Sequence, residues 1–97
     1  MPLFRHHAQA EARRRVALVV AMAAHVERNT PQLFPKATTD RLERAADDLL
    51  GSGPIRPETY FVVRRIREAV AARAPDRPWA AILRADLADL DLDLLHP

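Results

Sequence analysis

The residues that could bind a metal or support acid–base chemistry are few and scattered. The histidines are His6, His7, His25 and His96, and the sequence holds no cysteine. His7 and Glu11 stand four residues apart, so a helix would place them on one face, where they could act as two metal ligands. Zinc sites need at least three protein ligands, and no third candidate lies in the neighbouring sequence. We therefore predict no metal site.

The sequence also lacks a recognisable nucleophile motif and a phosphate-binding loop. Ser52, the only serine, lies in the segment Gly51-Ser52-Gly53-Pro54. That segment lacks the strand-to-helix turn of a nucleophile elbow, and no base lies nearby. No Gly-Lys-Ser/Thr sequence follows the glycines, so they do not form a phosphate-binding loop. The sequence therefore predicts neither an enzyme nor a bound cofactor.

Prolines and glycines divide the chain into four segments whose apolar residues recur at the three- and four-residue spacing of helices. We predict helices at about 5–28, 39–50, 57–74 and 77–90, with residues 91–97 as a C-terminal tail. A chain of 97 residues can bury one modest core. The predicted fold is thus a single all-α domain spanning residues 1–97, as a small four-helix bundle or an orthogonal four-helix array.

Apolar stripes predict which helix faces are buried. In the first helix, one stripe runs from Val16 to Val26, and Leu18, Met22 and His25 form a second beside it. This helix should therefore be buried on more than one side. Residues 31–34 are predicted to form a short helical turn. The other predicted core positions are Leu42, Ala45, Ala46, Leu49, Leu50, Val62, Val63, Ile66, Ala69 and Val70.

The composition indicates origin more than function. Lys36 is the only lysine beside 14 arginines, a bias that GC-rich bacterial codons explain. A net charge of +2 is small although the pI is about 9.9, so basicity alone does not predict nucleic-acid binding. The most apolar stretch, residues 16–24, is far shorter than the roughly 20 residues of a membrane helix. We predict a cytoplasmic bacterial protein without membrane contact.

Charge changes sign along the chain, which suggests an interaction surface. Residues 1–36 carry six basic and two acidic side chains, whereas residues 76–97 carry two basic and five acidic ones. Acidic residues at the end of a helix oppose its dipole, so their presence there can mark function. We predict that the acidic residues of the last segment, with the leucines between them, dock a basic partner. That partner could be the Arg13–Arg15 cluster of a second copy in a homodimer. The alternative is that these leucines belong to the hydrophobic core of their own chain. The predicted docking ridge comprises Leu83, Asp86, Leu87, Asp89, Leu90, Asp93 and Leu94.

Adjacent Tyr60 and Phe61 form the second predicted protein contact. Neighbouring residues on a helix diverge by about 100°, so both rings cannot face one core. One of them is therefore exposed, and exposed aromatic residues are enriched at interfaces. The alternative is that Phe34 packs over one of the two rings.

A helix-turn-helix-like DNA-binding regulator is the alternative function. The helix at 57–74 would read the duplex, and residues 51–56 would form the turn. That turn is longer than the usual three or four residues, and the start of the helix holds the apolar run Tyr60-Phe61-Val62-Val63. The arginines that would contact DNA are Arg13, Arg14, Arg15, Arg56, Arg64, Arg65 and Arg67.

The leading hypothesis is a small non-enzymatic helical protein that acts through protein–protein contacts. The chain is expected to associate with itself, and to act as an adaptor, an inhibitor or an immunity-type protein. The partner is another protein whose identity the sequence does not reveal.

Overall fold

The computed structural model describes residues 2–34, 36–72 and 78–88, with side chains from residue 8 onward. These ranges contain the helices α1 (Pro2–Asn29), α2 (Thr39–Leu50), α3 (Pro57–Ala72) and α4 (Pro78–Ala88), and they contain no strand. The prediction of an all-α fold with four helices is confirmed. Helix α2 has the predicted bounds, and α1 begins three residues before its predicted start. The predicted tail at 91–97 and the end of the predicted third helix lie outside the described residues.

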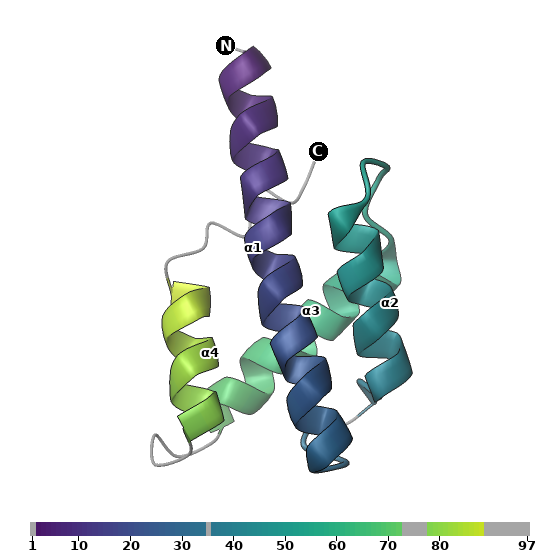
Figure 1. The fold of residues 1–97 in the computed structure, drawn as a ribbon, viewed down its shortest axis with the longest axis vertical. Helices are drawn as coiled ribbons and strands as arrows, with labels where there is room; N and C mark the ends of the chain where they lie inside the picture. Colours follow the sequence, from purple (N-terminus) through teal and green to yellow (C-terminus); the bar gives the residue numbers. More distant parts are fainter. Residues whose placement is uncertain (1, 35, 73–77, 89–97) are drawn as a thin grey trace.

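The helices form an irregular array, not a bundle of near-parallel rods. Helices α2 and α4 flank α1 and run in the opposite direction, and α3 crosses obliquely behind them (Figure 1). Helix α1 packs most extensively on α2, whereas α3 contacts each of the other three helices. One side of α1 is therefore lined by the other helices, and the first turns of α1 extend beyond them (Figure 1).

The ends of α2 show how the sequence sets the helix boundaries. Thr38 is the N-cap, and its hydroxyl accepts a hydrogen bond from the Arg41 backbone N–H at 3.4 Å. Asp40 places negative charge in the first turn, where the helix dipole favours it. At the other end, Gly51 donates its N–H to the carbonyl oxygens of Asp47 and Asp48. Its φ of −76° and ψ of 178° are extended, so α2 does not end in a left-handed glycine.

One hydrophobic cluster takes side chains from all four helices. The predicted core stripe of α1 is buried, and so are the predicted faces of α2 and α3, with three differences. Ala69 and Val26 are only half-buried, and Leu50 is 64% exposed. Phe34, Ala37 and Thr59 also join the buried set. The largest fully buried side chains are Phe34, Leu42, Leu49, Ile66, Leu83, Val16, Val20 and Val62.

The connection between α1 and α2 is a series of turns, so the short helical turn predicted at 31–34 is wrong. The Glu27 side chain, 6% exposed, accepts hydrogen bonds from the backbone N–H groups of Gln32, Leu33 and Phe34. Gln32 and Lys36 have positive φ values of 73° and 66°, which L-residues seldom adopt and which do not occur in a helix. The carboxylate of Glu27 thus replaces the missing helical hydrogen bonds of this segment.

Candidate interaction surface

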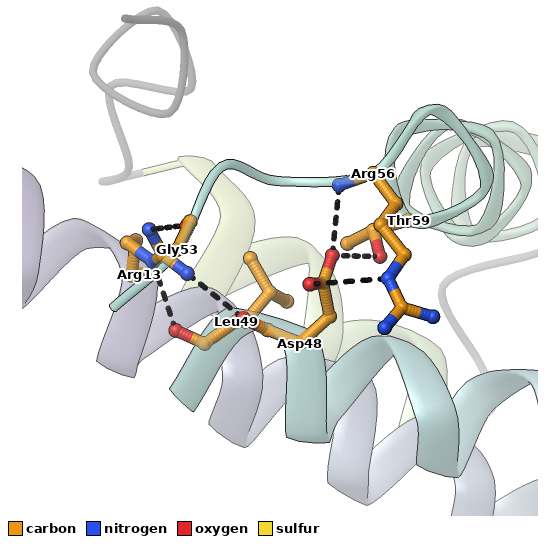
Figure 2. A network of polar contacts seen from close by, with 6 residues as sticks. All are labelled: Arg13, Asp48, Leu49, Gly53, Arg56 and Thr59. Carbon is orange, nitrogen blue, oxygen red and sulfur yellow. Dashed lines mark hydrogen bonds and ion pairs between the residues drawn. The ribbon is translucent and has the colours of Figure 1, made fainter. Parts of the chain in front are cut away.

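Arg13 is held by the end of α2 and is not a free cation. Its Nε donates to the Leu49 carbonyl at 3.0 Å, and its two terminal nitrogens donate to the carbonyls of Asp48 and Gly53 at 2.8 Å each. The last carbonyls of a helix have no partners within the helix. A guanidinium is suited to this position because its planar fork carries five N–H donors. Arg13 therefore ties α1 to the C-terminus of α2 (Figure 2).

The Asp48 side chain extends the same network to the start of α3. One carboxylate oxygen accepts from the Arg56 backbone N–H at 2.9 Å and from the Thr59 hydroxyl at 2.6 Å. The other lies 4.0 Å from Arg56 Nε (Figure 2). Partial burial acts to raise the pKa of the Asp48 carboxyl. The hydrogen bonds from Thr59 and Arg56, with the charges of Arg56 and Arg13, outweigh burial and hold that pKa below its usual value.

The network of Arg13 and Asp48 holds α1, α2 and α3 together, and the sequence did not predict these contacts. Arg13 lies 35 residues from Asp48 along the chain, so no local spacing connects them. The only sequence signal was the expected end of a helix near Gly51, which implies free carbonyl groups in need of donors.

The predicted ridge on α4 is partly core. Leu83 is fully buried and Leu87 is half-buried against the same cluster, so these leucines pack within their own chain, as the alternative interpretation held. Asp86 is exposed. The large apolar side chain exposed on the described part of α4 is instead Ile82, at 47%. Asp89, Leu90, Asp93 and Leu94 lie outside the described residues.

Tyr60 and Phe61 are both half-buried and pack against the core. The guanidinium of Arg65 lies 5.0 Å from the centre of the Phe61 ring, a cation–π geometry. Phe34 makes an edge-to-face contact with Trp79, with ring centres 5.6 Å apart. Neither Tyr60 nor Phe61 is a fully exposed ring. In the predicted protein contact, a partner would reach only the exposed part of each ring.

The remaining predicted arginines are spread over α1 and α3. Arg65 pairs with Glu68 at 3.3 Å. By contrast, Arg14 and Arg15 on α1 are exposed and make no ion pair with the described residues, and the same holds for Arg64 and Arg67 on α3. Of the seven arginines predicted to contact nucleic acid, three are thus engaged within the chain and four are free among the described residues.

The outward face of α1 is the surface that the sequence misjudged. Leu18 is 67% exposed and Met22 is 37% exposed, although this helix was predicted to be buried on more than one side. His25 is exposed as well, with its carbonyl oxygen accepting from Asn29. The prediction failed because α2, α3 and α4 all pack on the opposite side of α1. We define the α1 face as Arg14, Arg15, Leu18, Ala21, Met22 and His25, all exposed.

A shallow hollow of about 350 Å³ lies where the N-terminal half of α1 meets the end of α2. Arg14 and the 64% exposed Leu50 belong to its lining. Arg13 also borders it, but the guanidinium of that residue is occupied by backbone carbonyls. The hollow therefore places the exposed Leu50 beside the arginines at the start of the α1 face.

Three further observations bear on function. Comparison with protein families, curated proteins and solved structures found no match. No helix within the described ranges is long and apolar enough to cross a membrane. Those same ranges hold no cluster of three potential metal ligands, and the side chains of His6, His7 and His96 lie outside them.

Proposed function

We propose that this protein is a non-enzymatic interaction protein that binds another protein through the α1 face. The observation that carries the proposal is the exposure of Leu18 at 67% in the middle of a helix whose opposite side is buried from Val16 to Ala24. Met22 lies one turn further on the same face, and Arg14 and Arg15 lie one turn before Leu18. An apolar centre with a polar border is the usual arrangement of a protein interface.

The energetics support a modest but specific contact. Fully burying a leucine side chain contributes about 1.5–3 kcal/mol, and most of the Leu18 side chain is available for burial. The unpaired Arg14 and Arg15 would favour a partner with acidic residues beside an apolar strip, because opposite charges steer association and set its orientation. The proposed partner is therefore an acidic amphipathic helix.

The hydrogen bonds within the chain support a structural, non-enzymatic role for the carboxylates of Glu27 and Asp48. Glu27 accepts three backbone N–H groups, and Asp48 accepts one N–H and one hydroxyl. Carboxylates held by donors of their own chain act as fixed supports of the fold. The arginine-rich composition is typical of GC-rich bacterial genomes. We therefore also propose that the protein is bacterial and acts in the cytoplasm.

A site-specific cross-linking experiment tests the proposal. The sequence has no cysteine, so the exposed Ala21 can be changed to a single cysteine and labelled with a photoreactive group without removing Leu18 or Met22. Ala71, exposed on α3, is the matched control position. In an extract of the source organism, we expect protein adducts from position 21, few from position 71, and loss of the former when Leu18→Gln is added.

The substitution Leu18→Gln should leave the fold intact, because glutamine is a good helix former and the site is exposed. Equal adducts from the two positions, or adducts from position 21 that persist with Leu18→Gln, would refute the proposal. Circular dichroism of each variant checks that the fold is retained.

DNA binding is a second candidate, favoured by the two free arginines of α3. Arg64 and Arg67 are exposed, three residues apart and without ion pairs among the described residues. If both contact phosphates of duplex DNA, the affinity should fall with salt, and the double variant Arg64→Gln/Arg67→Gln should reduce the slope of log K against log salt by about 1.8. Fluorescence anisotropy of a labelled duplex measures this slope, and an unchanged slope would exclude the α3 arginines as the contact.

A further inference from the structure

Helix α4 presents an exposed strip whose chemistry is complementary to that of the α1 face. Ile82 is 47% exposed, and Ala85 and Asp86 beside it are also exposed. Residues at i, i+3 and i+4 share one face of a helix. The strip, which we call the α4 face, therefore joins one large apolar side chain, one small residue and one carboxylate. Asp86 makes no ion pair with the other described residues.

We infer that the α1 face of one copy binds the α4 face of a second copy, head to tail. The inference rests on the proposed function, because it names the helix that the α1 face recognises, one that carries a free carboxylate beside an apolar side chain. It also refines the arginine–aspartate contact predicted from the sequence: of the Arg13–Arg15 cluster only Arg14 and Arg15 remain available, and Ile82 replaces the buried Leu83.

The spacing of the two faces fixes the relative direction of the helices. Arg14 lies four residues before Leu18, and Asp86 lies four residues after Ile82. Four residues of helix span about 6 Å. When Ile82 packs against Leu18 with the helices antiparallel, Asp86 reaches the level of Arg14 and Arg15. A parallel pairing would place Asp86 at the level of Met22, away from both arginines.

Charge also favours this contact over a symmetric one between two α1 faces. An antiparallel pairing of two α1 faces around Leu18 would bring Arg14 to the level of Met22 and Arg15 to the level of Ala21 of the other copy. No carboxylate would then meet the two arginines. The α4 face supplies that carboxylate together with an apolar neighbour for Leu18.

A head-to-tail contact leaves one α1 face and one α4 face unused in every pair, so association continues into rings or chains. The two faces offer only a few side chains each, far below the 20–30 residues a side of a standard interface. The contact is consequently weak, and association is expected to rise with concentration over the micromolar to millimolar range and to fall with salt.

Matched variants test the inference by sedimentation velocity or light scattering. Leu18→Gln removes the apolar centre of the α1 face and Ile82→Gln that of the α4 face, while each leaves the net charge and the other face intact. Each variant alone should be monomeric, with self-affinity reduced about tenfold or more. An equimolar mixture should form a 1:1 pair that grows no further, because one intact face of each kind remains.

The outcomes separate the inference from the proposed function. A monomeric wild type, or a mixture that stays monomeric, overturns the head-to-tail contact; the cross-linking at position 21 then decides the proposed function by itself. If Leu18→Gln abolishes association and Ile82→Gln does not, the α1 face binds another surface, and only the inference fails. If neither variant changes the association of the wild type, the copies associate through other surfaces and the inference is wrong, while the cross-linking at position 21 decides the proposed function.

Discussion

Glu27 supports three backbone N–H groups with one buried carboxylate, so removing its charge should weaken the fold measurably. In Glu27→Gln, one oxygen is replaced by an NH2 group, which donates and cannot accept. Oε2 accepts from Leu33 at 2.9 Å and from Phe34 at 3.1 Å, while Oε1 accepts from Gln32. The amide oxygen of glutamine can take only one of these two places.

The magnitude follows from the hydrogen bonds that are lost. A hydrogen bond to a charged group contributes about 1.5–3 kcal/mol, and leaving a buried N–H without a partner costs about 1–3 kcal/mol. Even with the oxygen kept toward Leu33 and Phe34, the charge and the bond to Gln32 are gone. We expect a loss of about 2–4 kcal/mol, which for a chain of this size lowers Tm by roughly 10–30 °C.

Urea unfolding followed by far-UV circular dichroism measures the change, with Glu43→Gln as the matched control. Glu43 pairs with Arg28 at an exposed site, and such pairs contribute about 0–1 kcal/mol. A loss below about 1 kcal/mol for Glu27→Gln, with an unchanged m-value, would refute the reasoning. The connection would then be held by the packing of Phe34 and not by the carboxylate.

Three other substitutions test the supports of the fold. Arg13→Lys should cost about 1–2 kcal/mol in urea unfolding, because one ammonium cannot reach three carbonyl groups, whereas Arg14→Lys should be neutral; equal losses would contradict the capping role. The pKa of Asp48 is lowered on folding, so the stability it supplies is complete above its unfolded-state value near 3.8 and is lost as pH falls through the folded-state value. Wild type should therefore lose more stability than Asp48→Asn between about pH 5 and pH 2, and parallel urea midpoints over this range would contradict the lowered pKa. Leu83→Ala should cost about 2–5 kcal/mol and Ile82→Ala under about 1 kcal/mol, and the reverse order would place Leu83 on the surface.

The sequence predicts the helices well because their signals are local. Thr38 and Asp40 at the start of α2 are recognisable without knowledge of the rest of the chain. Pro57 marks the first turn of α3 in the same way. The buried stripe of α1 is equally local, since residues at three- and four-residue spacing share one face in any helix.

The exposed positions were mispredicted because hydrophobicity does not say how many neighbours surround a helix. Leu18 and Met22 have the same side-chain character as the buried residues of α1, and they are exposed only because all three other helices pack on one side. Leu50 follows the buried Leu49 at the end of α2, where no described element covers it. The supports Arg13 and Glu27 escaped prediction because their partners are backbone groups, which carry no side-chain signature in the sequence.

The three consecutive arginines of α1 show why counting charges misleads about function. Successive helical residues point about 100° apart, so Arg13, Arg14 and Arg15 cannot serve one purpose. Arg13 faces α2 and donates hydrogen bonds to three backbone carbonyl groups. Arg14 and Arg15 face outward beside Leu18. The contacts that occupy Arg13 also hold α2 against α1. With α3 and α4 packed on the rest of the buried half of α1, the half that carries Leu18 stays uncovered. The capping of α2 and the exposure of the α1 face are thus two consequences of the same packing, and a partner for that face has to come from outside the described part of this chain or from another copy of it.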